Sequence, residues 1–582
     1  MSVFISVFYC GLWSTIKDTY KKVNMEYRQV VRPPFLVRLR VGSNPSIPKK
    51  SNIKYGNTHN WIKKKFTYSL IKNLESSDLL SANFDNYVPV FFFNDIKTII
   101  PELFLITSVL GLIIYGSILA VSSSNKYPLL TRNISWLSVL VLSFTLLLTY
   151  NNMVETGAIF TRTFIIDDLS NYSKMIIILC TITCLIISKN YIIDYRLNSF
   201  EYYIIILLSI LGLMLLATSY DLLSVYLALE LQSLSFYILA SFKRNSTFST
   251  EAGLKYFILG AFASGLILFG ISLIYGFTGT TNFDCLSKLF YSGFLSNLDG
   301  INTIKIGVLF IIVGLLFKLA AAPFHVWSPE VYEGSPTSST AIFAILPKIA
   351  ILVVFCRLFM FSFYNLLETW QDIVVFSAIA SVIIGSFVAL KQRKVKRLIA
   401  YSSISHVGYI LISMSTGTFE GCHALFFYII IYMVTGICLW SIVFSVELEN
   451  NFSNRNVTDL SSLLKSNSIL AITASLVLFS LAGVPPLSGF FAKLLIFLSA
   501  LESSMYFIAF IGILSSVIST FYYIRIIKII YFEKVSFWNF YKPITQLKSL
   551  ILGNSFFLIV LLFINPNLFL LATYKMSSTL FL

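Results

Sequence analysis

The sequence has 582 residues, of which 57% are hydrophobic and only 12% are charged. Soluble domains carry about 25% charged residues, so this composition excludes an ordinary soluble enzyme. Together with repeated apolar runs, it indicates a helical membrane protein with many spans, whose interior can hold buried polar side chains.

The N-terminal residues 1–93 form a basic extension. Most of the net charge of +16 comes from residues 1–72, which hold 14 Lys and Arg against two acidic residues, Asp18 and Glu26. A solvated or headgroup-bound arm is the favoured interpretation. A targeting presequence, which is also basic and poor in acidic residues, is the alternative.

Fourteen apolar runs follow between Pro101 and the C-terminus. Most of them approach or exceed the ~20 residues that a helix needs to cross a bilayer. We therefore predict an all-α polytopic membrane protein with transmembrane helices at residues 101–122, 134–150, 172–188, 201–219, 221–242, 252–277, 306–326, 340–361, 372–390, 398–415, 421–446, 468–500, 503–531 and 549–573.

The distribution of Lys and Arg between the loops predicts the topology. These residues concentrate in the loops that follow odd-numbered spans, notably at 391–397 and between Arg525 and Lys548. By the positive-inside rule these loops face the cytoplasm or the matrix, which places both termini on the other side. The basic extension then lies on the side that the rule disfavours, and the sequence leaves this conflict open.

Four ionisable residues stand near the middle of predicted spans: Glu230 in the fifth, Lys318 in the seventh, Lys348 in the eighth and Lys493 in the twelfth. A charge at the centre of a bilayer helix costs ~2.5–3.5 kcal/mol and is normally kept for an ion or proton path. A buried carboxylate needs a partner, and Lys318 is the natural candidate for Glu230. Lysines that snorkel to the headgroups are the structural alternative, which the four residues together disfavour.

Two segments interrupt their spans in a similar manner. FKLAAAPFHVWSP in the seventh span and SLAGVPPLSGFFAK in the twelfth each combine small residues, proline and lysine, with helix breaks expected at Pro323, Pro485 and Pro486. The two spans lie five apart, so they cross the membrane in opposite senses. Interrupted helices at matching places in two halves indicate an inverted-repeat transporter.

The remaining titratable residues carry less information. His325 lies seven residues after Lys318 and fits a proton relay and a structural hydrogen bond equally well. His406 fits a satisfied buried histidine better than a relay. Glu330 and Glu333 are expected in a solvated loop. No P-loop, dinucleotide fingerprint, metal site or iron–sulfur spacing occurs, so the sequence offers no redox centre.

These motifs carry a resemblance to a known family. FKLAAAPFHVWSPEVYEGSPTSSTAIFAILPK, SSISHVGY and SLAGVPPLSGFFAK, with NDIKTIIPELFL and FIIDDLSNYSK before the first and third spans, are similar to the subunit 2 family of NADH:ubiquinone oxidoreductase, respiratory complex I, and its bacterial and plastid counterparts. The similarity runs from about Asn94 to the C-terminus. Lys493 favours this family over subunit 4, which has glutamate at that place.

The resemblance implies an antiporter-like subunit of the membrane arm. It implies three first helices in 94–200, two inverted five-helix repeats in 201–361 and 372–531 with broken seventh and twelfth helices, and a C-terminal helix and tail in 549–582. By the same resemblance, Glu230 and Lys318 form a coupled pair, Lys348 is the central relay and Lys493 is the terminal proton site.

The implied function is proton translocation within the enzyme NADH:ubiquinone reductase. NAD, FMN, iron–sulfur clusters and ubiquinone would belong to other subunits of the complex, with none of them in this chain. The expected partners are other membrane-arm subunits and lipids, with no nucleic acid. Heavy use of Phe, Ile, Leu, Tyr, Asn and Lys suggests an AT-rich organellar genome and favours the mitochondrial inner membrane.

Two other functions stay open from the sequence. A subunit of an Mrp-type cation/proton antiporter would use the same lysines without electron transfer. A purely structural membrane subunit is the third possibility, which the mid-span lysines disfavour because each of them would cost stability without benefit.

Overall fold

The computed structural model describes residues 95–119, 130–152, 157–195, 197, 199–291, 300–446, 456–534 and 541–581. The chain divides into two units, Met1–Asn83 and Phe84–Leu582, and all described residues belong to the second unit. The predicted basic extension of residues 1–93 lies outside the described residues.

The apolar runs form helices, as a chain in lipid must satisfy its own backbone hydrogen bonds. Among the described residues, thirteen helices are long and apolar enough to cross a membrane. The remaining predicted run, 468–500, is divided between two shorter helices, α18 (Ser468–Ala482) and α19 (Ser488–Glu502). The long helices are α4 (Ile100–Leu119), α5 (Leu130–Asn151), α6 (Asp168–Asp194), α7 (Glu201–Thr218), α8 (Leu222–Ala240), α9 (Thr247–Thr278), α11 (Ile301–Leu319), α13 (Thr337–Cys356), α14 (Leu367–Leu390), α15 (Val395–Ser415), α16 (Phe419–Ser445), α20 (Tyr506–Tyr531) and α21 (Gln546–Ile564).

Shorter elements interrupt or connect these helices. A two-stranded antiparallel hairpin pairs Gly157 with Ile166 before α6, and a π-helical turn extends α13. The short elements are β1 (Gly157–Ile159), β2 (Phe164–Ile166), α10 (Phe283–Tyr291), α12 (Trp327–Gly334), η3 (Arg357–Ser362), η4 (Tyr364–Leu366), η5 (Val457–Ser462), α17 (Leu463–Ser466), α18 (Ser468–Ala482), α19 (Ser488–Glu502) and α22 (Asn567–Phe581).

The C-terminal region holds two helices where the sequence predicted one span and a tail. α21 ends at Ile564, and Asn565 leaves the helical conformation with φ −137° and ψ 85°. Pro566 has no N–H with which to continue the helix, but its carbonyl oxygen accepts from the N–H groups of Phe569 and Leu570 and so begins α22.

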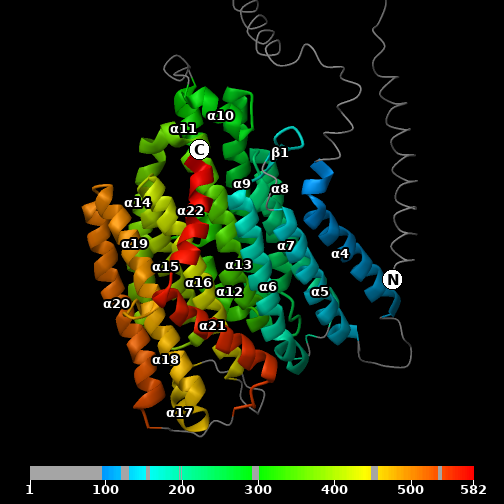
Figure 1. Ribbon diagram of the computed structural model, residues 1–582, viewed down its shortest axis with the longest axis vertical. Helices are drawn as coiled ribbons and strands as arrows, with labels where there is room; N and C mark the ends of the chain where they lie inside the picture. The colour runs from blue at the N-terminus through cyan, green and yellow to red at the C-terminus, as the bar shows by residue number, and fades with distance from the viewer. Residues whose placement is uncertain are drawn as a thin grey trace, which may run out of the picture. The chain divides into compact units, whose positions relative to one another are not determined.

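α13 forms the centre of the bundle, because all of its residues are buried. The helices α6, α7 and α16 pack against it. Figure 1 shows most spans standing side by side, with α4 at one edge, α20 at the opposite edge and α21 crossing the others obliquely. Lys348 therefore lies on the most enclosed of the membrane-spanning helices that the structure describes.

Small residues let α9 and α11 approach closely. A Cβ atom at Gly270 of α9 would lie 2.6 Å from the backbone oxygen of Gly307 of α11. Membrane helices use such small residues because lipid provides no hydrophobic drive for helix association, and close packing replaces it. This contact positions α11, which carries Lys318.

Candidate functional site

α11 and α18 end in the same hydrogen-bonding pattern, and both are followed by the predicted proline breaks. Ala320 and Gly483 adopt the left-handed conformation, with φ +60° and +86°. The next residue in each case, Ala321 or Val484, donates its N–H five residues back, to Leu316 and to Phe479. The peptide bonds Ala322–Pro323 and Pro485–Pro486 are both cis.

The two lysines lie on opposite sides of these interruptions. Lys318 belongs to the last turn of α11, before its break. Lys493 belongs to α19, after the second break. The half-helix α12 resumes after Pro323. The Trp327 indole donates to the carbonyl oxygen of Phe317 at 2.9 Å, which also accepts from the N–H of Ala320, and so ties α12 to the end of α11.

Lys318 contacts a tyrosine hydroxyl. Its Nζ donates to the Oη of Tyr237 at 3.3 Å. Tyr237 lies on α8 two turns after Glu230, and Glu230 and Lys318 interact electrostatically. Within the described residues, the two charges form no ion pair shorter than 4.0 Å. One oxygen of Glu230 is buried without a hydrogen-bond partner. Glu230 and Lys318 are thus neighbouring groups that form no ion pair, and Tyr237 is bound to the lysine.

Lys348 lies in the enclosed interior directly after Pro347 of α13. Its side chain is 4% exposed. The Nζ donates to the Oη of Tyr432 at 2.6 Å, and Tyr432 donates in turn to the carbonyl oxygen of Ala344 at 3.4 Å. The buried ammonium thus has one hydroxyl partner, so its charge is only partly compensated.

Lys493 is held by the end of the preceding half-helix. Its Nζ donates to the carbonyl oxygens of Leu481 and Ala482 at 3.1 and 2.8 Å. These carbonyls belong to the last turn of α18, where they have no partner within the helix and carry the negative end of its dipole. The side chain is 6% exposed, so the interruption itself provides the acceptor site for the cation.

His406 of α15 lies in the neighbourhood of Lys348 and Lys493. Its Nδ1 lies 2.7 Å from the Oη of Tyr428, and its Nε2 lies 3.1 Å from the Oη of Tyr523. Both lysines interact electrostatically with the imidazole. Both ring nitrogens are occupied, as expected for a satisfied buried histidine, and the ring also lies near Tyr432, with 5.5 Å between the ring centroids.

A small cavity completes this group. It has a volume of about 10 Å³ and is lined by His406, Tyr428, Tyr432 and Lys493, with Thr435 and Ser480. That volume is comparable to the ~10–15 Å³ that one water molecule requires, and the lining supplies the polar partners that such a water needs. We call Lys348, Tyr432, His406 and Lys493 the lysine row.

His325 takes no part in this arrangement among the described residues. It lies beyond the interruption of α11, half-buried, and its Nδ1 has no hydrogen-bond partner. Its backbone carbonyl accepts from Ser328 at 3.1 Å. His325 carried more weight than His406 in the sequence analysis. Tyr428 and Tyr432, which were not considered there, lie one helical turn apart and would have indicated a polar environment for a histidine.

The prediction that Glu330 and Glu333 lie in a loop is wrong, although their side chains are partly exposed, at 40% and 27%. Both lie on α12, where Glu330 pairs with Lys255 of α9 at 2.7 Å. Glu333 pairs with Lys394 and, at 3.6 Å, with Arg397. α12 therefore connects α9 with the basic segment that begins α15.

A buried ion pair escaped the sequence analysis. Glu102 of α4 and Lys174 of α6 are both 2% exposed, and their charged atoms lie 2.5 Å apart. Asp167, which directly precedes α6, pairs with Arg357 of the π-helical turn at 2.6 Å. Nearby, burial and a hydrogen bond to Asp284 raise the pKa of Tyr220.

Fold and site together define a polytopic helical membrane protein of the antiporter-like class, with ionisable side chains buried between interrupted spans. Residues 219–519 match the NADH:quinone oxidoreductase/Mrp antiporter transmembrane family. The chain is 46% identical to NADH-ubiquinone oxidoreductase chain 2 of Marchantia polymorpha, over 84% of this chain and 99% of that protein. It is 43% identical to NADH-quinone oxidoreductase subunit N of Pelagibacter ubique, over 76% and 90%.

Solved structures agree with this assignment. A chain of respiratory complex I from Thermus thermophilus with bound aureothin superimposes with a TM-score of 0.67 and 26% identity, covering 82% of this chain and 99% of that one. A chain of the Mrp complex from Dietzia has a TM-score of 0.71 at 20% identity, covering 84% and 98%, which shows a common fold. The protein belongs to the chain 2 family of NADH:quinone oxidoreductase, so the predicted family is confirmed.

Proposed function

We propose that this chain translocates protons as an antiporter-like subunit of an NADH:quinone oxidoreductase. The observation that carries the proposal is the lysine row. Lys348 is buried and donates to a tyrosine hydroxyl, which can exchange protons, and Lys493 is buried against backbone carbonyl oxygens. His406 interacts electrostatically with both lysines. Buried charges of this kind are expensive in a membrane and are normally retained for ion or proton transfer.

The chemistry required of these residues is a change of protonation state. Burial disfavours the charged lysine, while a nearby carboxylate favours it. A movement that brings Glu230 toward Lys318, or away from it, would therefore switch the proton affinity of the lysine. Tyr237 contacts Lys318 and lies on the same helix as Glu230, so it is placed to respond to both states.

The proton then passes along the lysine row. Tyr432 donates to Ala344 and accepts from Lys348, and its hydroxyl can exchange that proton. The ring nitrogens of His406 are bound to Tyr428 and Tyr523, so a proton would reach or leave the imidazole through these hydroxyls, or through a water in the small cavity that His406 lines together with Tyr432 and Lys493. Lys493 is the final acceptor, stabilised by the end of α18. The route from Lys318 to Lys348 requires water or a movement, and His325 is not needed for it.

The electron transfer that drives this movement belongs to other subunits. In this proposal NAD, FMN, iron–sulfur clusters and ubiquinone are bound elsewhere in the complex, and the neighbours of this chain are other membrane-arm subunits and lipids. The two repeats, 201–361 and 372–531, form the moving halves. The composition and the plant mitochondrial relatives support the mitochondrial inner membrane as the location.

Replacing Lys318 with methionine tests the proposal. In the purified complex in liposomes, Lys318→Met should keep NADH oxidation measurable but lower the number of protons moved per NADH. Lys305→Met is the matched control, because Lys305 lies in the first turns of the same helix and should leave the ratio unchanged. An unchanged ratio in Lys318→Met would refute a role for this lysine in translocation.

The Mrp-type alternative predicts a different result. If the chain worked as a cation/proton antiporter without electron transfer, its assembly would exchange sodium for protons with no NADH oxidation. The 46% identity to complex I chain 2, against the fold-level likeness to the Mrp chain, favours the oxidoreductase.

A further inference from the structure

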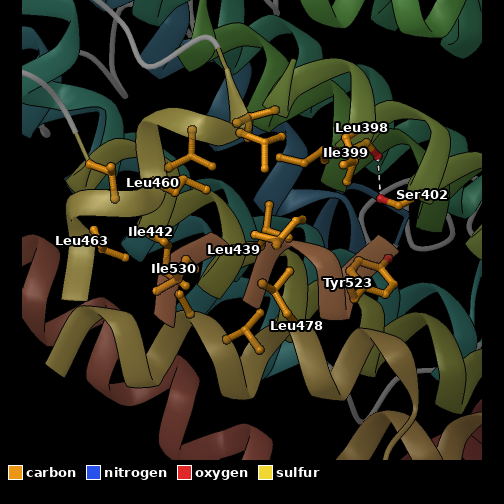
Figure 2. Close-up of a pocket in the computed structure, with 17 residues that line it drawn as sticks. Leu398, Ile399, Ser402, Leu439, Ile442, Leu460, Leu463, Leu478, Tyr523 and Ile530 are labelled. Carbon is orange, nitrogen blue, oxygen red and sulfur yellow. Dashed lines mark hydrogen bonds between the residues drawn. The ribbon is translucent and has the colours of Figure 1, made fainter. Parts of the chain in front are cut away.

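A cavity of about 80 Å³ lies between α15, α16, α18, α20 and the short helices η5 and α17. Fifteen of the seventeen residues that line it are apolar, and the two polar ones are Ser402 and Tyr523. Figure 2 shows these two at one end of the cavity, Leu439 and Leu478 across its middle, and Leu463 at the other end.

The polar end of the cavity adjoins the lysine row. The Oη of Tyr523 lies 3.1 Å from the Nε2 of His406, and His406 interacts electrostatically with Lys348 and Lys493. Tyr523 therefore stands between the row and the cavity, with its hydroxyl bound to the row and its ring in the cavity wall.

The apolar end lies beside the basic segment at 391–397. Val457, at the start of η5, lines the cavity, and its N–H donates to the carbonyl oxygen of Arg393 at 2.9 Å. Val395 also lines it, next to Lys394, whose ammonium pairs with Glu333. Arg393 and Lys394 are exposed. The cavity thus extends from the lysine row toward the basic, exposed end of the bundle.

The chemistry of the lining keeps water out. Each water molecule needs ~10–15 Å³ and two to four polar partners, and cavities lined by Leu, Ile and Phe stay dry. The volume would hold several waters, but the polar partners are confined to one end. Ser402 already donates to the carbonyl oxygen of Ile399 at 2.8 Å. The cavity therefore has room for water, but outside its polar end the lining lacks the groups that would retain it.

We propose that Tyr523 begins a second proton branch from His406 toward the basic end of the bundle, and that the dry cavity is the hydrophobic gate that closes this branch. The inference rests on the proposed function, because it assumes that protons move along the lysine row. A pump needs such a barrier. If a water chain connected the lysine row to one compartment while the row was open to the other, protons would flow back and the proton gradient would be lost.

The test introduces polar groups into the middle of the cavity. Leu439→Asn with Leu478→Asn keeps branched side chains but replaces methyl groups with amides that hold water. In liposomes containing the purified complex without NADH, an imposed pH difference should decay about tenfold faster than with the unmodified protein, equivalent to about 1.4 kcal/mol of stabilisation of the water chain. The matched control, Leu439→Ala with Leu478→Ala, enlarges the cavity but leaves it apolar, and its decay rate should stay unchanged.

A third variant tests the link to the lysine row. Adding Tyr523→Phe to the asparagine pair should restore slow decay, because the branch then lacks its hydroxyl. The proposal is overturned if the asparagine pair causes no leak, if the alanine pair leaks equally, or if the leak persists without the Tyr523 hydroxyl. Should the asparagine pair prevent assembly, Val477→Thr places one hydroxyl in the same lining with little change of volume, and the same criteria apply.

The leak assay is independent of the test of the proposed function. The leak is measured without NADH. If the asparagine pair causes no leak, the proton ratio measured for Lys318→Met during NADH oxidation is not affected. A failure of the proposed function would appear as an unchanged ratio during turnover, whatever the passive decay rate.

Discussion

The ammonium nitrogen of Lys493 lies 2.8 Å from the carbonyl oxygen of Ala482, across the interruption between α18 and α19. The break therefore does more than end a helix. It frees carbonyl groups at membrane depth, and the lysine that follows in sequence folds back to use them. Lys318 lies on the other side of its own interruption and binds Tyr237 instead, so the two similar sequence motifs hold their lysines in different ways.

Gly483 should be intolerant of substitution. Its φ of +86° is unfavourable for residues with a side chain, and a Cβ atom there would lie 2.9 Å from Cδ of Lys493. We expect Gly483→Ala to lower stability by about 1–2 kcal/mol from backbone conformation alone and to lower the proton ratio by displacing the lysine. Thermal unfolding of the purified complex and the proton ratio measure the two effects. The control is Gly265→Ala, where a Cβ would meet nothing within 4 Å. It should leave the proton ratio unchanged and should not lower stability, because alanine is favoured over glycine inside a helix.

His406 should be needed for proton transfer beyond its structural role. His406→Gln keeps hydrogen-bonding capacity toward Tyr428 and Tyr523 but cannot carry a proton between two nitrogens. We expect the variant to assemble, to oxidise NADH and to move fewer protons per NADH. His423→Gln serves as the control, because His423 contacts the carbonyl oxygen of Leu570 at 3.3 Å and lies away from the lysine row. Equal proton ratios in the two variants would argue against the relay.

Removal of the Tyr237 hydroxyl should weaken the coupling between Glu230 and Lys318. Tyr237→Phe leaves the ring in place and takes away the group bound to the lysine, so we expect a lower proton ratio at near-normal NADH oxidation. Tyr275→Phe, on the exposed side of α9, should leave both quantities unchanged. If Tyr237→Phe also changes neither, the hydroxyl is a packing feature and not part of the coupling.

The ion pair between Glu102 and Lys174 should be sensitive to loss of one partner. Both charges are buried, so Glu102→Gln leaves an uncompensated ammonium and should cost about 3–5 kcal/mol. The double variant Glu102→Leu with Lys174→Met removes both charges and should recover most of that loss. Thermal unfolding of the assembled complex distinguishes the two; a double variant as unstable as the single one would contradict this explanation.

The contact of Glu333 with Lys394 is partly exposed, with side-chain exposures of 27% and 48%. Exposed pairs contribute about 1 kcal/mol or less, because water screens them. We therefore expect Glu333→Gln to have a small effect that shrinks further at high salt. A large, salt-independent loss of stability would mean that α12 depends on this pair for its position.

Much of the architecture followed from patterns that are local in sequence. Apolar runs of helical length predicted the spans, because a chain in lipid has few alternatives to the helix. Charged residues within such runs were recognisable as candidates because a charge is costly at membrane depth. They are Glu230, Lys318, Lys348 and Lys493. The C-terminal break at Pro566 was missed because one apolar run covered two helices.

The contacts between these residues depend on packing across distant segments. The sequence could name Lys348 and His406, but it could not place them beside Tyr432 and Tyr523, which come from other helices. Nor could it show that Lys318 binds Tyr237, or that an apolar cavity adjoins Tyr523. Hydrophobicity and the need for backbone hydrogen bonds determine which segments cross the membrane, and both are local properties of the sequence. Which side chains meet is determined by helix packing, because packing depends on the shapes of all neighbouring helices at once.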